Sequence, residues 1–317
     1  MGETIMIKQI IRKIPSVYRF LMLFVENYYK FTYQMSEGDK EKLLKLIAKD
    51  YRKKTHLTLR IPPVSYTEKI QFAKIFNSTP EKGLLSDKYL VRKWVEQKIG
   101  SDYLIPLLGV WDNFEDIDFD SLPNQFVLKT NHGSGTNIIV TDKNKIDKKE
   151  MKKKIKFWLK EDFAFAGKGY ELHYSYIKPK ILAEAYVVDS LGELNDYKFL
   201  CFNNKPCFVW VDVGRRTDHR RNVYDTDWNL QPFRQWTYKN TDYPLDKPKN
   251  FELMLSIAEK LCVGFDHVRV DLYNVDGKVY FGEMTFTNGQ GYEVIIPNEY
   301  DDILGGYWNQ ENYLGEK

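Results

Sequence analysis

Residues 268–291 read VRVDLYNVDGKVYFGEMTFTNGQG, and this stretch decides the fold. Apolar residues alternate with Arg269 and Asp271 over 268–273, which is the period-two pattern of a half-buried strand. The sequence NVDGK then predicts a turn, and a second strand follows over 279–286 and carries Glu283. The stretch therefore predicts a β-hairpin that carries charged side chains where a plain strand would have none.

The length of the turn decides whether these charged residues meet. A two-residue turn over 276–277 would pair Asp271 with Gly282 and send Glu283 to the other face of the sheet. A three-residue loop with a bulge would shift the pairing by one residue and place Arg269, Asp271 and Glu283 on one face. The order Asn-x-Asp-Gly-Lys favours the second geometry.

Asp271 and Glu283 are candidate ligands of Mg²⁺. Two carboxylates on adjacent strands repel each other unless a cation lies between them. Carboxylate oxygens suit Mg²⁺, which commonly completes its coordination shell with phosphate. Two surface carboxylates beside a solvated arginine would give the same sequence pattern, so the hairpin alone leaves both interpretations open.

The composition is that of a soluble globular protein. The chain has 317 residues, of which 43% are hydrophobic and 29% charged, enough for one large domain or two or three smaller ones. Its net charge of +3 is uneven: residues 1–60 hold 13 Lys and Arg against 6 Asp and Glu, whereas the remainder holds 34 against 38. The basic segment suggests contact with an anionic surface such as lipid or a polyanionic glycan, or a solvated basic helix. We expect no nucleic-acid partner, because no recognised binding module accompanies the charge.

The cysteines and the N-terminus favour a cytoplasmic protein. The three cysteines lack metal-ligand spacing, which favours buried thiols in a reducing compartment. No secretory signal is evident, and the uncharged apolar run over 20–25 is too short to span a bilayer. An apolar surface that packs on a membrane, on a partner helix or on its own domain could be formed by Ile10, Ile11, Ile14, Val17, Tyr18 and Leu21.

The order of elements predicts an α+β fold rather than a doubly wound one. We expect a helical, basic segment over 1–55, an N-terminal linker subdomain over 56–122, and a nucleotide-binding and catalytic domain over 123–317. Helices are predicted over 66–76, 87–100, 143–160 and 251–263, and strands over 103–111, 126–140 with an interrupting loop, 180–187, 196–202 and 206–213. Residues 56–61 are strand-like, 78–83 form a turn, and 214–234 and 301–317 are predicted to be irregular.

A glycine-rich loop, TNHGSGTN over 130–137, lies between two predicted strands. Gly133 and Gly135 would let backbone N–H groups approach an anion, and Lys129 just before them would add a fixed positive charge. The loop is no Walker A motif, because its lysine precedes the glycines. Most loops of this kind are plain hairpin turns.

Three other groups of polar residues are candidates. Glu184 lies near the end of a strand, where it could accept a hydrogen bond from an adenine amino group or be a plain strand glutamate. Asp196 and Lys198 point to one face, as binding residues or as a surface ion pair. A cluster that suits phosphate or carboxylate, or that is merely solvated, consists of Arg215, Arg216, His219, Arg220, Arg221 and Asn222.

These segments occur in an order that resembles the ATP-grasp superfamily, and more closely its TupA-like family, which is associated with teichuronopeptide and other bacterial surface-polysaccharide synthesis. The segments that carry the resemblance are LSDKYLVRKWVEQKIGSDYLIPLLGVWD, FVLKTNHGSGTNIIV, DYKFLCFNNKP and the hairpin itself. They cover most of residues 60–300. The resemblance implies an ATP-grasp fold, in which two α+β subdomains clasp ATP, with a helical basic extension at the N-terminus.

The resemblance also implies roles for individual residues. Phosphate would be contacted by Lys88 and Lys129, and covered by a mobile lid that contains His132, Gly133, Ser134 and Gly135. The adenine would lie against Glu184 and the backbone of Ala185 to Val187, and the ribose against Asp196. Lys198 and Arg221 would face substrate or phosphate, and Arg269 would stabilise a developing oxyanion. Asp271 and Glu283 would hold Mg²⁺. Many relatives have Glu-x-Asn where this chain has Glu283-Met284-Thr285, so Thr285, or Asn288 in its place, would complete the metal site.

The activity implied is that of an ATP- and Mg²⁺-dependent carboxylate–amine ligase that forms an acylphosphate. The carboxylate would belong to a uronic-acid-bearing glycan or its precursor, and the amine to an amino acid or amino alcohol. The alternatives are a glycan kinase, a glycosyltransferase, and an inactive nucleotide-binding scaffold. Lys129, Asp271 and Glu283 argue against the scaffold.

Overall fold

The computed structural model describes residues 15–36, 38–166, 169–190, 192, 194–215 and 217–310, and for residues 15–20 the backbone only. The α-helices are α2 (Pro15–Met35), α3 (Lys40–Thr55), α4 (Tyr66–Phe76), α5 (Pro80–Ser86), α6 (Val91–Ile99), α7 (Lys148–Trp158), α8 (Phe251–Cys262) and α9 (Glu299–Tyr307). The strands are β1 (Leu107–Trp111), β2 (Phe126–Thr130), β3 (Asn137–Val140), β4 (Ile181–Ala185), β5 (Asn195–Phe202), β6 (Lys205–Val213), β7 (Arg220–Asp225), β8 (Arg234–Gln235), β9 (His267–Val275), β10 (Lys278–Thr285) and β11 (Ile295–Ile296).

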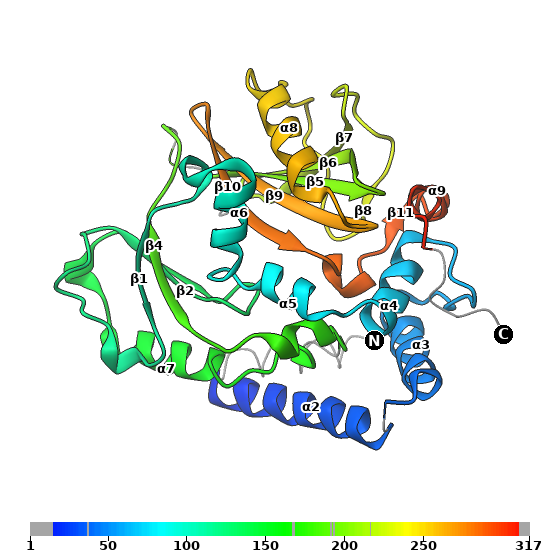
Figure 1. Ribbon diagram of the computed structural model, residues 1–317, viewed down its shortest axis with the longest axis horizontal. Helices are drawn as coiled ribbons and strands as arrows, with labels where there is room; N and C mark the ends of the chain where they lie inside the picture. The colour runs from blue at the N-terminus through cyan, green and yellow to red at the C-terminus, as the bar shows by residue number, and fades with distance from the viewer. Residues whose placement is uncertain are drawn as a thin grey trace.

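Two antiparallel sheets organise the molecule (Figure 1). The larger sheet has the strand order β10-β9-β5-β6-β7, and the smaller has the order β1-β4-β2-β3. A further short sheet pairs β11 with β8. The prediction of a mixed α+β fold is therefore confirmed. β1, which precedes the predicted domain boundary at 122–123, pairs with β4 of the smaller sheet.

The alternation of side chains along the larger sheet separates its core from its polar face. On β5, Phe199 and Cys201 point into an apolar core shared with α6 and α8. Leu200 and Phe202 point the other way, into a second core shared with α4 and α9. Asp196 and Lys198 have the same parity as the second pair but lie at the other end of the strand. That end of the sheet therefore presents charged groups, and these groups make the site described below.

The remaining helices cover the smaller sheet and the N-terminal region. Met151 and Ile155 of α7 are buried against the smaller sheet. α2 and α3 pack on α4 and on Ala164, Phe165 and Tyr170 through a third core. α2 runs along the lower edge of the view in Figure 1, and its Lys30 pairs with Asp162 at 2.9 Å. The helical nature of the N-terminal segment is thus confirmed for the described residues. Within these residues no helix has both the length and the apolarity to cross a membrane.

The hairpin of β9 and β10 reaches the predicted arrangement by a different route. Val275 pairs with Lys278, so the turn has two residues, Asp276 and Gly277, with φ values of 49° and 91°. The predicted three-residue loop is therefore wrong. A bulge further along, between Phe281 and Glu283, supplies the extra residue, and Glu283 pairs with Asp271. The bulge restores the shared face that the turn alone would have lost.

Several predicted element boundaries are wrong. The segment 214–234, predicted to be a loop, contains β7, and the tail from 301 begins inside α9. Residues 78–83 enter α5 instead of forming a turn, and no strand forms over 56–61. The basic helix is shorter than predicted and begins at Lys148, where Asp147 caps it by accepting from the backbone N–H groups of Lys149 and Glu150. The proposed apolar surface of Ile10 to Tyr18 lies outside the described side chains.

Candidate functional site

A cavity of about 440 Å³ lies between the two sheets and collects most of the predicted site residues. The smaller sheet contributes Lys129 and Glu184, and the larger sheet contributes the charged ends of β5, β6, β7, β9 and β10. The predicted residues in its wall are Lys88, Lys129, Gly133, Ser134, Gly135, Glu184, Ala185, Val187, Asp196, Lys198, Arg221, Arg269, Asp271 and Glu283. His132 and Thr285 do not line it.

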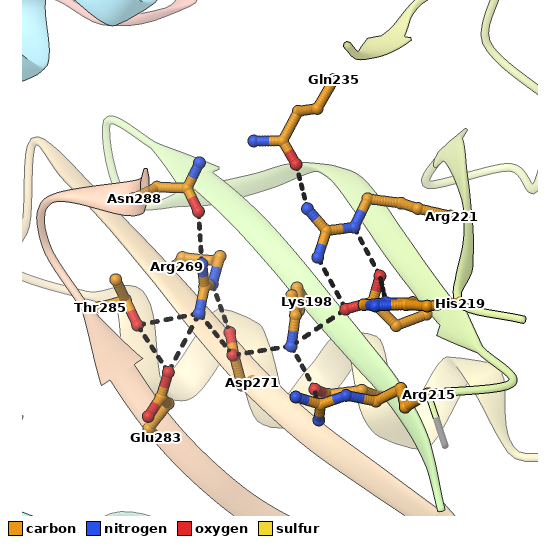
Figure 2. A network of polar contacts seen from close by, with 12 residues as sticks. Lys198, Arg215, His219, Arg221, Gln235, Arg269, Asp271, Glu283, Thr285 and Asn288 are labelled. Atoms are coloured by element: carbon orange, nitrogen blue, oxygen red, sulfur yellow. Dashed lines mark hydrogen bonds and ion pairs between the residues drawn. The ribbon is translucent and has the colours of Figure 1, made fainter. Parts of the chain in front are cut away.

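Arg269 lies between the two carboxylates of the hairpin (Figure 2). Its Nε and Nη2 atoms donate to the two carboxylate oxygens of Asp271, both at 2.7 Å. Nη2 also donates to Glu283 Oε1 and Thr285 Oγ1, each at 3.1 Å, and Nη1 donates to Asn288. Since one nitrogen serves both carboxylates, Asp271 and Glu283 lie within two hydrogen-bond lengths of each other. Thr285 therefore belongs to this cluster even though it does not face the cavity.

Lys198 is surrounded by three aspartates. Its Nζ atom contacts Asp196, lies 3.2 Å from Asp271 Oδ2 and lies 3.5 Å from Asp212 Oδ2. All four side chains are buried. Asp196 also accepts from Arg215 at 2.6 Å, and its buried Oδ1 atom has no partner among the described residues. An unpartnered buried carboxylate oxygen is costly, so it indicates a place for a ligand donor such as a sugar hydroxyl.

Lys88, Lys129 and the glycine-rich loop form the other side of the cavity. Lys88 Nζ donates to the carbonyl oxygen of Gly133 at 2.6 Å and lies 3.6 Å from Glu283 Oε2. Lys129 Nζ lies 2.5 Å from Glu184 Oε2, and Arg92 approaches the same carboxylate at 3.3 Å. Glu184, predicted as an adenine contact, thus pairs with two cations in this structure. The two lysines nevertheless bring positive charge to the loop that was predicted to cover phosphate.

His132 supports the glycine-rich loop from behind. Its Nε2 atom lies 3.1 Å from the carbonyl oxygen of Trp158 and 3.2 Å from that of Glu161, so this nitrogen donates. Burial lowers the pKa of His132 to about 4, and the ring is neutral. A Cβ atom on Gly133 would approach Thr136 to 2.6 Å, so only glycine fits there. The loop is therefore held by packing on its inner side.

Arg221 and Asn222, neighbours in the polar cluster noted in the sequence, point to opposite faces of β7. Arg221 faces the cavity, where its Nε and Nη2 atoms donate to Asp212 at 2.5 and 2.7 Å. Asn222 is buried on the other side and bonds to Tyr224 and Thr241. Arg221 is committed to Asp212 and Gln235, so its guanidinium organises the wall.

Sequence reasoning missed several residues of the cavity wall. Asp212 and Glu293 were not singled out, and His219 and Arg215 were noted only as members of a basic cluster. Asp212 interrupts the apolar strand PCFVWVDV, and it pairs with Asp196 across β5 and β6. The alternation of side chains along a strand, which identified Asp196 as a candidate, would have identified Asp212 in the same way.

The charges of the cavity lower the pKa of two of its carboxyl groups, Glu283 and Asp212, whereas burial raises the pKa of Asp271. Burial acts to raise the pKa of Glu283, but Lys88 and Arg269 outweigh it and hold the pKa at about 2. Burial also acts to raise the pKa of Asp212, and the neighbouring His219 and Arg221 outweigh it, so the net shift is downward. Ionised carboxylates are the form that a metal ion binds.

The hairpin fits a divalent ion that arrives with part of its own coordination shell. Among the described residues, no three His, Cys, Asp or Glu side chains are placed to hold a metal by themselves. Asp271 and Glu283 can offer two carboxylate ligands, and Thr285 and Asn288 carry further oxygens beside them. Such a partial set suits Mg²⁺, which keeps waters and phosphate oxygens as ligands. In this arrangement, however, the Arg269 guanidinium fills the space between the two carboxylates.

A family model described as TupA-like ATPgrasp matches residues 68–309. Among solved structures, the chain is similar to D-alanine–D-alanine ligase from Bacillus anthracis, with 14% identity, a TM-score of 0.42, and coverage of 74% of this chain and 71% of that one. No curated protein matches this sequence significantly.

Two further structures are similar to the chain. N5-carboxyaminoimidazole synthetase from Staphylococcus aureus, complexed with ADP, shows 14% identity and a TM-score of 0.39, with 64% of this chain and 44% of that one covered. The ATP-grasp ligase PsnB, complexed with minimal precursor, Mg and ADP, shows 10% identity and a TM-score of 0.36, with 73% and 60% covered. This chain thus spans less than two thirds of the length of these two proteins.

Proposed function

Because this chain belongs to the TupA-like ATP-grasp family, we propose that it is an ATP-dependent ligase that joins a carboxylate to an amine through an acylphosphate. The observation that carries the proposal is the convergence of Asp271 and Glu283 on one face of the hairpin, opposite Lys88 and Lys129 in one cavity. Paired carboxylates for a metal and paired lysines for phosphate are what phosphoryl transfer from ATP requires.

The lysines and the glycine-rich loop would bind the phosphates. Lys88 and Lys129 would neutralise the charge that spreads over the transferred phosphoryl group. The backbone of Gly133 to Gly135 would lie over the phosphates and exclude water from the acylphosphate. Asp271 and Glu283 would hold Mg²⁺, which when bound supplies additional positive charge to the phosphate oxygens.

The reaction has two steps. In the first, a substrate carboxylate oxygen bonds to the γ-phosphorus of ATP, and the bond to the bridging oxygen breaks to release ADP. In the second, the amine nitrogen bonds to the acyl carbon, the bond from that carbon to the phosphate oxygen breaks, and a proton leaves the nitrogen. Arg269 would donate to the oxyanion that forms between these events, in a site from which water is largely excluded.

We infer that the carboxylate belongs to a sugar acid of a surface polysaccharide or its precursor. This inference rests on membership of the family alone. The exposed part of Arg215 at the cavity wall supports an anionic substrate, since its guanidinium contacts Asp196 through one nitrogen. Glycan phosphorylation and glycosyl transfer are the competing reactions. Mass spectrometry separates them: an amide product indicates ligation, and a sugar phosphate indicates a kinase.

ADP release tests the proposal directly. With ATP, Mg²⁺, a uronic-acid oligosaccharide and an amine, we expect ADP release that requires both the carboxylate and the amine. Glu283→Gln should abolish it, whereas Glu252→Gln, an exposed glutamate on α8, should not. ADP release that needs no amine would contradict ligation.

We also propose that α2 rests on an anionic lipid surface, which would place the protein at the cytoplasmic face of a membrane. Leu21, Phe24, Tyr28, Phe31 and Met35 recur every three or four residues along one face of α2 and are between 38% and 64% exposed. Residues 1–36 hold five Lys and Arg against two Glu. An apolar face flanked by basic residues is typical of helices that lie in the membrane interface.

Vesicle flotation tests this contact. The protein should float with vesicles containing phosphatidylglycerol and not with pure phosphatidylcholine, and Phe24→Ser with Phe31→Ser should abolish flotation. Tyr243→Ser, at an exposed aromatic elsewhere, is the matched control. Equal binding by the double variant would contradict the proposal. The proposal would also be contradicted if the wild type sediments as a dimer and the double variant as a monomer, because this face of α2 would then bind a second copy of the chain.

A further inference from the structure

Amide formation must remove a proton from the attacking nitrogen, and a positioned base accelerates such a step. Most ionisable groups of the cavity are poor bases. The lysines and arginines of its wall each pair with a carboxylate. Asp271 and Asp212 are each paired with a guanidinium, and the pKa of Glu283 is held at about 2. Asp196 and Glu184 are likewise paired with cations, although one oxygen of Asp196 has no partner among the described residues. His219 and Glu293 are the remaining imidazole and carboxylate groups of the described cavity wall.

His219 has the geometry of an oriented base. Its Nε2 atom lies 3.1 Å from Oδ1 of the fully buried Asp212, which Arg221 fixes; this is an ion-pair contact rather than an aligned hydrogen bond. The ring packs against Tyr238 in a tilted arrangement, with ring centroids 4.5 Å apart. Within the described part of the chain, Nδ1 has no hydrogen-bond partner. The carboxylate and the tyrosine therefore hold the ring while one nitrogen remains available.

The same aspartate connects His219 to the expected acyl centre. Asp212 Oδ2 lies 3.5 Å from Lys198 Nζ, and Lys198 lies 3.2 Å from Asp271. His219, Lys198 and Arg269 all line the one cavity. In the proposed reaction, a substrate whose acyl carbon lies before Arg269 would receive its amine from the side of His219.

Glu293 is the weaker alternative. Its carboxylate accepts from the amide of Gln235 and lies 4.0 Å from Arg221. Both contacts engage Oε2 and tie the carboxylate to the wall of the cavity.

We propose that His219, oriented by Asp212, is the catalytic base that takes the proton from the amine in the second step. As the carbon–nitrogen bond forms and the carbon–oxygen bond to phosphate breaks, the proton passes to Nδ1 of His219. It then leaves to solvent or to the released phosphate. Asp212 does not touch substrate and is a positioning residue. This assignment rests on the proposed ligase activity.

Two partial reactions separate the assignment from the activity on which it rests. Reversible acylphosphate formation is measured without amine, as carboxylate-dependent exchange of ¹⁸O between the β,γ-bridge and non-bridge positions of ATP. Amide formation is measured by mass spectrometry with a glucuronate oligosaccharide and L-glutamate. His219→Gln should retain isotope exchange within about twofold and lose amide formation by about 100-fold or more. Asp218→Asn, an exposed neighbour outside the cavity, is the control.

Chemical rescue distinguishes a proton acceptor from a structural residue. His219→Ala should regain part of its amide-forming rate when free imidazole is added, and its thermal unfolding should match that of the wild type. Wild type without isotope exchange would refute the proposed function itself. If the wild type shows exchange and His219→Gln forms amide at an undiminished rate, only the role of His219 is overturned. Loss of isotope exchange in His219→Gln would overturn that role as well. Selective loss in Glu293→Gln instead would assign the base to Glu293.

Discussion

Replacing Arg269 with alanine should change two properties in opposite directions, because its guanidinium lies where a metal ion would bind. Two of its nitrogens hold both oxygens of Asp271 at 2.7 Å, and one of them also holds Glu283 at 3.1 Å. A divalent ion that uses both carboxylates must displace these hydrogen bonds. We therefore expect Arg269→Ala to bind free Mn²⁺ more tightly and to turn over more slowly.

The contacts set the size of both effects. A hydrogen bond to a charged group contributes about 1.5–3 kcal/mol net. If displacement of the guanidinium costs the equivalent of one such bond, its removal should tighten Mn²⁺ binding by about 10- to 100-fold. Loss of an oxyanion donor slows turnover by about 100- to 1,000-fold.

Electron paramagnetic resonance of free Mn²⁺ measures the first effect without nucleotide or substrate. The matched control is Arg220→Ala, since Arg220 pairs with Asp218 at 2.7 Å outside the cavity. Unchanged or weaker Mn²⁺ binding by Arg269→Ala would refute the idea that the guanidinium and the metal compete for Asp271 and Glu283.

Three further perturbations test other parts of the structure. Lys129→Met should weaken ADP binding by about 10- to 100-fold in calorimetry, because it removes one charge-assisted contact to phosphate; unchanged affinity would place Lys129 outside the nucleotide site. Asp212→Asn should lower the free energy of unfolding in urea by about 3–5 kcal/mol, since it leaves Arg221 buried without its counter-charge. Adding Arg221→Met should recover part of this loss. If the destabilising effects of the two substitutions simply add, the two side chains do not stabilise the fold as an ion pair. Burial raises the pKa of Asp301 from 3.8 to about 6, so the protonated side chain stabilises the folded state fully below pH 4, and this stabilisation is lost as the pH rises to about 6. Relative to Asp301→Asn, the free energy of unfolding of the wild type should fall by up to about 3 kcal/mol across that range. Parallel curves of unfolding free energy against pH for the two proteins would contradict the shift.

Local patterns in the sequence predicted the faces of the strands better than their connections. The alternation in β9 placed Arg269 and Asp271 on one face of their strand, and the alternation in β5 did the same for Asp196 and Lys198. The structure confirms both predictions and brings the two pairs onto one face of the sheet. The predicted length of the turn was wrong, because the extra residue that restores the register is Gly282, in a bulge further along β10. A Cβ atom there would come within 3.1 Å of the Asp271 carbonyl oxygen, which is a contact across the sheet that no local pattern reveals.

The missed elements depend on partners that are distant in sequence. β7 has an arginine, Arg221, where a buried strand would normally have an apolar residue, so the strand shows no apolar alternation. The arginine can be buried because Asp212 of the neighbouring strand neutralises its charge. α9 contains two adjacent glycines, which argue against a helix. Gly305 nevertheless suits this helix, since a Cβ atom there would meet the backbone oxygen of Val64 at 2.0 Å. In both cases a tertiary contact outweighs a local preference.

Calorimetric titration of ADP, with Mg²⁺ and with EDTA, tests most directly whether Asp271 and Glu283 hold a metal ion on a nucleotide. We predict that the wild type binds ADP at least tenfold more tightly with Mg²⁺. The combined variant Asp271→Asn with Glu283→Gln should show no difference between the two conditions while its fold persists. Binding that is equally tight with EDTA, or a Mg²⁺ effect that survives in the variant, would contradict the account.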